Sequence, residues 1–235
     1  MTIKEMHFDV KMKLNKVDSQ SYRNLKVPEI DWALNEALEL FIKMVAFPRI
    51  KTRLGFENVQ RNTDNIRTLV ISSGTLPVVG NVFPITGPLN YWHFISGNVT
   101  ITKENCTKQA RIKIRQHDDE FESSPFDKSS FEWRTVNAVF NSGGLSFFTD
   151  GTFAITSAEI QYVRRPAYIH NAGDYAGGTY ILPSGVTLSG TQDCELPMET
   201  HREIVDIAVL ILSGQLQTSD YQLKFSKLNF NNLNN

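Results

Sequence analysis

Apolar residues recur every three or four positions in the segment between Pro28 and Pro48. Proline suits the first position of a helix, and Glu29 and Asp31 lie where the helix dipole favours negative charge. The repeat consists of Ile30, Leu34, Leu38, Phe41 and Val45. Because this spacing is typical of a helix with one buried face, the pattern predicts an amphipathic helix that begins at Pro28 and is stopped by Pro48.

Two further segments show helical periodicity. The first covers residues 57–70, with a heptad-like series at Phe56, Val59, Thr63, Ile66 and Val70. The second begins at Pro197 and ends at Gly214, with its polar residues confined to one stripe. So wide an apolar surface indicates that this last helix is buried on several sides, either between the two earlier helices or against a neighbouring subunit.

The middle of the chain has the texture of a β region, in which Gly, Pro, Ser and Thr separate short runs of strand-forming residues. Asp150-Gly151 between two such runs predicts a two-residue hairpin turn. Alternation of apolar and basic residues over 110–115 predicts a strand with one wet face. Residues 91–102 and 180–188 are predicted as further strands.

These elements predict an α+β fold: a small helical bundle, made of two N-terminal helices plus a C-terminal helix, with an inserted antiparallel β domain. We assign residues 1–27 to an N-terminal arm, either extended or an edge strand. Residues 28–71 and 195–214 form the helical portion. Residues 72–194 form the β domain, a sandwich or a barrel, and residues 215–235 form a docking tail.

Charge and composition exclude several classes of protein. The chain has 24 Lys and Arg against 25 Asp and Glu, so it has no global attraction for nucleic acid or anionic lipid. Its two cysteines, Cys106 and Cys194, are far apart in the sequence and indicate a reducing compartment without a disulfide. No signal peptide and no membrane-spanning run is recognisable, so we expect a protein that is cytosolic wherever it is made and does not bind membranes.

No known catalytic or phosphate-binding motif occurs in the sequence. The one cluster of metal-binding residue types is the run 117–120, a histidine followed by three acids. Four consecutive residues do not converge easily on one ion, so a charged loop is the favoured interpretation. We therefore expect no enzyme, with no catalytic residues, no metal site and no cofactor.

The surplus apolar and basic residues are candidates for contacts between subunits. The apolar candidates on the last helix and the tail are Ile204, Ile207, Val209, Ile211, Leu212, Leu216, Tyr221, Leu223, Phe225 and Phe230. The charged candidates are Arg49, Lys51, Arg53, Arg61, Arg67, Arg164 and Arg165. The basic residues suit either phosphates or a partner's acids, and the neutral chain favours the acids.

Five segments, in this order and spacing, resemble a known family. They are ALNEALELFIK, RLGFENVQRNTDNIRTLV, QHDDEFESSPFDKSSFEWRTV, FFTDGTFAITSAEIQYVRRPAYI and ELPMETHREIVDIAVLIL. Together they resemble the head-to-tail connector or ring (adaptor) structural proteins of crAss-like podoviruses. The family offers no catalytic residue to carry over.

The resemblance implies a virion structural protein, made in the host bacterial cytoplasm, that forms an oligomeric ring in the portal-proximal neck or tail connector of a tailed bacteriophage. Such a ring joins portal to tail and leaves a channel for DNA, which passes without sequence-specific binding. The implied partners are copies of the chain in a cyclic, twelve-fold assembly, the portal protein, and other ring, neck or tail proteins.

Two other functions are compatible with the residues. The aromatic segments 90–92 and 175–180 suggest a host-attachment or carbohydrate-binding β module of a phage particle. The run 117–120 would be the centre of a metal-dependent hydrolase. Large closed oligomers would identify the connector ring, glycan binding would identify the attachment module, and metal binding would identify the hydrolase.

Overall fold

The computed structural model describes residues 1–15, 25–46, 64–85, 90–116 and 126–215. The chain divides into two compact units. The helical unit consists of Met1–Thr68 with Pro166–Asn235, and the β unit consists of Leu69–Arg165. This arrangement confirms the α+β class and the insertion of a β domain between helical segments.

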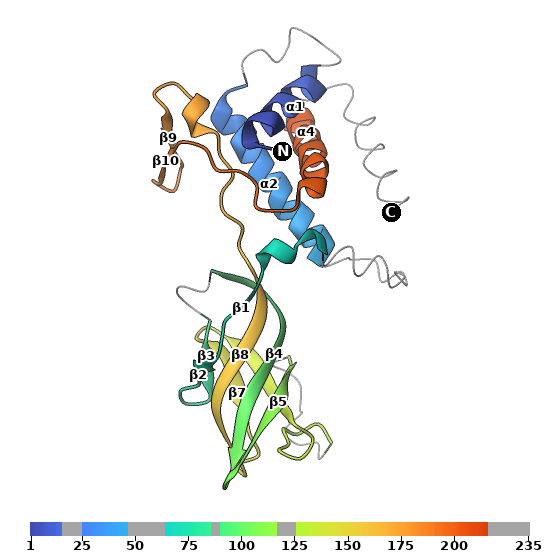
Figure 1. The fold of residues 1–235 in the computed structure, drawn as a ribbon, viewed down its shortest axis with the longest axis vertical. Helices are drawn as coiled ribbons and strands as arrows, with labels where there is room; N and C mark the ends of the chain where they lie inside the picture. Colours follow the sequence, from blue (N-terminus) through green and yellow to red (C-terminus); the bar gives the residue numbers. More distant parts are fainter. Residues whose placement is uncertain (16–24, 47–63, 86–89, 117–125, 216–235) are drawn as a thin grey trace, which may run out of the picture. The chain divides into compact units, whose positions relative to one another are not determined.

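The described helices of the helical unit are α1 (Ile3–Asn15), α2 (Val27–Ala46) and α4 (His201–Gln215), with the short helix η3 (Met198–Thr200) directly before α4. Helix α4 packs against both α1 and α2, as Figure 1 shows. Its fully buried side chains include Ile204, Val205 and Ala208. The helix predicted from Pro28 is therefore confirmed as α2, and the helix predicted from Pro197 as η3 followed by α4.

The prediction of an extended N-terminal arm is wrong, because its first half is helix α1. Thr2 and Glu5 form a capping box: Thr2 N donates to Glu5 Oε2 at 2.8 Å, and Glu5 N donates to Thr2 Oγ1 at 3.4 Å. The buried residues Ile3, Met6, Val10 and Leu14 then follow at helical spacing. Both signals are present in the sequence, but the charged residues between the apolar positions resemble the alternation of a strand.

The second predicted helix, residues 57–70, falls largely outside the described residues. Of its described part, Asp64 and Asn65 are helical and η1 covers Arg67–Leu69. The strand β1 (Val70–Ser72) then starts at the last predicted helical residue.

The helical unit also contains a small two-stranded sheet. The segment after Pro166 forms η2 (Ala172–Asp174) and an antiparallel pair of strands, β9 (Thr179–Ile181) and β10 (Thr187–Ser189). The single strand predicted over 180–188 is therefore two short strands. They cluster with the helices, so the β domain ends at Arg165 and not at residue 194.

The β unit is one curled sheet of eight strands, ordered β1-β8-β4-β5-β6-β7-β3, with β2 also paired to β8. After β1, its strands are β2 (Leu76–Pro77), β3 (Val82–Pro84), β4 (Tyr91–Lys103), β5 (Cys106–Ile114), β6 (Thr135–Asn141), β7 (Gly144–Phe148) and β8 (Ala154–Arg164). The inner face buries a continuous core that includes Phe83, Ile101 and Leu145. The sheet is mixed, not purely antiparallel, because β5 and β6 run parallel.

The hairpin predicted at Asp150-Gly151 is also wrong. Asp150 Oδ1 accepts hydrogen bonds from Thr152 N at 2.9 Å and Thr152 Oγ1 at 2.7 Å, so a local turn does form. However, β7 pairs with β6 and β3, whereas β8 pairs with β4, β1 and β2. The turn therefore links strands that are not neighbours, since each has already found other partners along its length.

Candidate interaction surface

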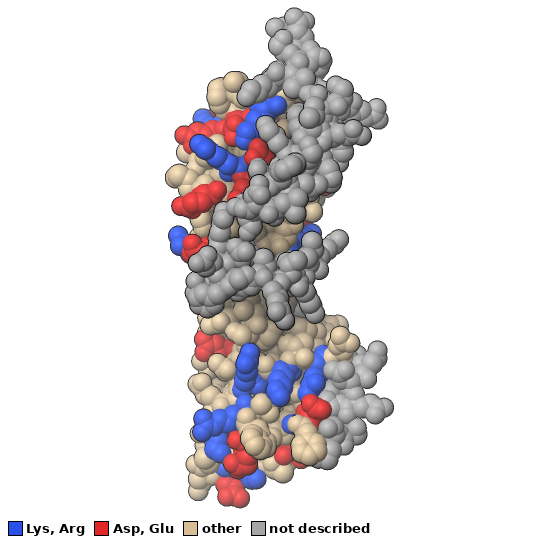
Figure 2. All heavy atoms as spheres, turned by 90° about the vertical axis from the view of Figure 1, so that its right-hand side faces the viewer, with Lys and Arg blue, Asp and Glu red and all other residues tan. Residues whose placement is uncertain are grey.

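Strand β5 presents three basic side chains on the outer face of the sheet. Arg111, Lys113 and Arg115 alternate with the inward residues Ala110 and Ile112, which are 1% and 5% exposed. This confirms the predicted strand with one wet face, although Ile114 at its end is exposed. Figure 2 shows Lys and Arg side chains gathered on the β unit.

The loop 126–134 covers the same outer face of the neighbouring strand β6. Asn137 pairs in register with Lys113, and its side chain is buried beneath this loop. Asn137 Nδ2 donates to the carbonyl of Asp127 at 2.6 Å, and Asn137 N donates to Ser129 Oγ at 2.9 Å. The loop backbone is thus tied to the strand that it crosses.

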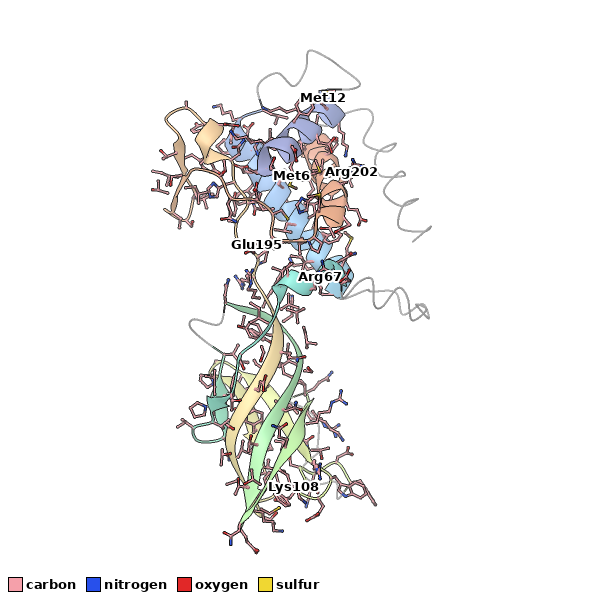
Figure 3. All side chains as sticks on the ribbon, viewed as in Figure 1. Met6, Met12, Arg67, Lys108, Glu195 and Arg202 are labelled. Atoms are coloured by element: carbon pink, nitrogen blue, oxygen red, sulfur yellow. The ribbon has the colours of Figure 1, made fainter. Side chains whose placement is uncertain are left out.

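The other end of the loop is held from inside the sheet. Phe131 is 6% exposed, and its ring centroid lies 6.2 Å from that of Phe153. The ammonium of Lys108, labelled in Figure 3, lies 4.3 Å above the Phe131 ring and 3.3 Å from Glu132 Oε2. Ser130 and Thr135 exchange backbone hydrogen bonds and close the turn.

This fixed loop turns two large aromatic side chains toward solvent. Phe126 is 97% exposed and Trp133 is 83% exposed. Exposed Trp residues on a rigid scaffold are typical anchors of protein interfaces, because their side chains lose little conformational entropy when they are buried by a partner.

Three cations lie on strand β5 and on the loop that carries these aromatic residues. Arg111, Lys113 and Arg134 are exposed, and no carboxylate of the described residues lies within ion-pair distance of them. Arg134 is next to Trp133, and its carbonyl accepts a hydrogen bond from Arg111 N at 2.8 Å. By contrast, Arg115 is paired with Asp127 at 2.7 Å. We name the set of Arg111, Lys113, Phe126, Trp133 and Arg134 the aromatic-basic face.

Four of the apolar interface candidates on α4 lie in the core of the chain itself. Ile204, Ile207, Val209 and Leu212 are between 0% and 6% exposed. Ile211 alone of the five is partly exposed. The interface prediction is therefore wrong for these four residues, because α1 and α2 of the same chain cover the wide apolar surface of α4.

Only some of the remaining interface candidates lie within the described residues. Arg49, Lys51, Arg53 and Arg61 lie outside the described residues, as do Leu216, Tyr221, Leu223, Phe225 and Phe230. Arg67, labelled in Figure 3, is exposed and pairs with Asp64 at 2.7 Å.

The basic pair at the end of β8 stays near the surface. Arg164 is half-buried, with its Nη1 donating to the Arg165 carbonyl at 3.3 Å. Arg165 is exposed, and its backbone N donates to the carbonyl of Asn90 at 2.9 Å. The structure does not bring this pair together with Arg67 in one unit.

Sequence reasoning missed Phe126 and Trp133. Both belong to the stretch FDKSSFEWRT, in which three aromatic residues occur among polar ones. Nothing in the spacing says that Phe131 points inward while the other two point outward. The burial of Phe131 depends on contacts with distant residues such as Phe153, and the parallel pairing of β5 and β6 was not predicted either.

A buried polar cluster in the helical unit is a second place where chemistry could occur. Asp31 is fully buried and accepts hydrogen bonds from His7 Nε2 at 2.7 Å and from the Tyr180 hydroxyl at 2.7 Å. The backbone N of Asn171 also donates to this carboxylate, at 3.1 and 3.2 Å from its two oxygens. The donors come from α1, from the segment around η2 and from β9, so the carboxylate ties three segments to α2.

Two tyrosines next to Asp31 are held in their neutral form. Burial, followed by the negative charge of Asp31, raises the pKa of Tyr168 to about 12, while the neighbouring Tyr180 hydroxyl acts in the opposite direction. Burial also raises the pKa of Tyr180, and its hydrogen bond to Asp31 adds to the effect. Because Asp31 is sealed from solvent and saturated with donors, the cluster fits a structural role better than catalysis.

The helical unit also has an open groove of about 730 Å³ beside α1 and α4. Its walls are charged, with Lys4, Glu5, Asp9, Lys13 and Arg202 around the exposed ring of Phe8. Arg202, one of the residues that line the groove, is labelled in Figure 3. Lys13 is held by Asp9 at 3.0 Å and by Asp206 at 2.8 Å, so part of this charge is already paired.

The described residues provide no metal centre. No group of three or more His, Cys, Asp or Glu side chains converges among them, and the run 117–120 lies outside them. Both cysteines are free: Cys106 is exposed, and burial raises the pKa of the Cys194 thiol to about 11. Within the described part of the chain, no helix is long and apolar enough to cross a membrane.

No family model matches the chain, and no curated protein matches its sequence.

Proposed function

We propose that the chain is a non-enzymatic structural subunit of a phage virion, which forms an oligomeric ring in the neck or tail connector. The observation that supports this proposal best is the aromatic-basic face. The Trp133 side chain is 83% exposed, and its loop is fixed at both ends by hydrogen bonds and a buried Phe. An exposed indole on a fixed loop is suited to bind a protein partner. The five sequence segments that resemble connector proteins support the same function.

Exposed apolar side chains on the helical unit provide further contact area. Phe8 and Met12 lie one turn apart on α1, and they are 66% and 56% exposed. Trp32, Leu40 and Met44 on α2 are also exposed. A closed ring needs two different patches on every subunit, since each copy contacts its two neighbours through different surfaces.

The aromatic residues that suggested the carbohydrate-binding alternative pack against other rings of the chain. Tyr91 packs against Tyr162 and Phe140, with ring centroids 5.7 and 6.4 Å apart. Tyr175 packs against Tyr180, which is 8% exposed. Trp92, the remaining aromatic residue of these segments, is half-buried and stacks on His93 with ring centroids 4.8 Å apart. Each of the four aromatic side chains therefore already packs against another ring of its own unit.

The mass of the purified chain in solution tests the proposal. Light scattering coupled to size exclusion, and negative-stain electron microscopy, should show closed rings of the chain alone or together with the phage portal protein. A glycan array serves as the control for host attachment. A monomer that does not bind the portal protein, or a trimer that binds a defined glycan, would refute the proposal that the chain forms a ring.

A further inference from the structure

The charges of the β unit are separated into a basic surface and one acidic run. The described residues of this unit contain nine Lys and Arg but five Asp and Glu. The four acids that restore neutrality are Asp118, Asp119, Glu120 and Glu122, which all belong to the run 117–122, HDDEFE. This run and the aromatic-basic face therefore have opposite charge in every copy of the chain.

The aromatic-basic face lacks acidic partners where they would be expected. Arg115, at the end of β5 on the same outer face, is matched by Asp127 from the covering loop. Arg111 and Lys113, earlier on this face, are exposed and have no carboxylate partner among the described residues. A surface that pairs one of its cations and leaves the others open is suited to an acidic ligand.

We propose that the acidic run 117–122 of one copy binds the aromatic-basic face of the next copy in the ring. This inference rests on the proposed function. Each copy then offers one basic and one acidic surface, the two complementary patches of a head-to-tail interface. Trp133 and Phe126 supply the apolar area, and the charges fix the orientation and accelerate the encounter.

Charge reversal with mixing tests this contact. The first variant reverses the basic surface with Arg111→Glu and Lys113→Glu, and the second reverses the acidic run with Asp118→Lys, Asp119→Lys and Glu120→Lys. Each variant alone has like charges at every interface, so we expect at least a tenfold weaker association. An equimolar mixture should recover association, because alternating copies again pair opposite charges at all interfaces of an even-numbered ring.

The matched control places two charge reversals on the helical unit, Lys11→Glu and Lys26→Glu, both at exposed positions. This control should assemble like the original chain, and circular dichroism should show that all variants are folded. Because the contact is electrostatic at exposed groups, its contribution should also weaken as salt concentration rises.

Three outcomes overturn the inference. Variants that assemble as well as the original chain would show that these charges are not at the interface, while leaving the ring itself intact. A mixture that fails to recover would show that the acidic run pairs within its own chain. A fluorescent single-stranded oligonucleotide that binds the original chain but not the first variant would assign the face to nucleic acid. A chain that forms no closed oligomer, with or without the portal, removes both proposals.

Discussion

The helical unit and the β unit differ in whether they bury or expose the apolar and charged groups that a partner could bind. In the helical unit, the most apolar helix, α4, is covered by α1 and α2, and the carboxylate of Asp31 is sealed inside. In the β unit, the loop 126–134 is mostly polar, yet Trp133 and Phe126 on it are exposed. The cations on this loop and on β5 include three with no carboxylate partner among the described residues. The helical unit thus covers its most apolar helix and its buried carboxylate, whereas the β unit exposes the aromatic and basic side chains of this loop and the neighbouring strand.

This difference shows that the hydrophobicity of a segment is a poor guide to its role in assembly. A continuous apolar helix indicates burial, and the nearest partner is another helix of the same chain. An isolated aromatic residue in a polar segment indicates a contact between chains only when its backbone is fixed and its side chain is exposed. The following substitutions test that distinction.

The largest effect is expected for Asp31→Asn. The substitution replaces the carboxylate that accepts hydrogen bonds from His7, Tyr180 and the backbone of Asn171. At least one buried donor then faces the NH₂ group of the new amide. Loss of one partner in a buried charged network costs about 3–5 kcal/mol. We therefore expect a much lower free energy of unfolding in urea. Glu39→Gln, at an exposed ion pair with Lys43 on the same helix, is the control and should change the free energy of unfolding little. Equal effects of the two substitutions would show that the cluster is not internally satisfied.

The next effect is expected for Ile204→Ala. Ile204 is 0% exposed in the helical core, and truncation of a buried Ile to Ala costs about 2–5 kcal/mol. Ile211→Ala, on the same helix but partly exposed, should cost clearly less. Thermal denaturation of the two variants compares them directly. If Ile204→Ala left stability unchanged and weakened assembly, α4 would be an interface after all.

The sealed cluster should also make stability sensitive to alkaline pH. The pKa of Tyr168 is raised from 10.0 to about 12, so the folded state keeps a proton that the unfolded state releases. This contribution is fully present below pH 10 and is lost as the pH rises from 10 to about 12. Urea unfolding across this range should show the decline, and Tyr168→Phe should make it shallower. An unchanged slope in that variant would mean that Tyr168 is not shielded.

The sequence predicted elements with strong local signals and failed where pairing depends on distant segments. The helix after Pro28 and the alternating strand β5 follow from spacing alone, because one element determines the pattern. The hairpin at Asp150-Gly151 failed because β8 pairs with β4 over most of its length, which a local turn signal does not reveal. Trp133 was missed for the same reason, since the crossing of β6 by its loop is a long-range feature.

The smallest effect on stability, and the sharpest separation of the two roles, is expected within the loop itself. Trp133→Ala removes a side chain that is 83% exposed, so the free energy of unfolding should change by only about 0.5 kcal/mol. Its effect on assembly should be far larger, because buried Trp anchors contribute about 2 kcal/mol or more to a protein interface. Phe131→Ala, two residues earlier, is the matched opposite: the side chain lies in the core, and its loss costs about 3–5 kcal/mol of stability. Chemical denaturation and light scattering of both variants separate folding from association. A Trp133→Ala variant that assembles normally would mean that the exposed indole is not an anchor, even though the loop holds it outward.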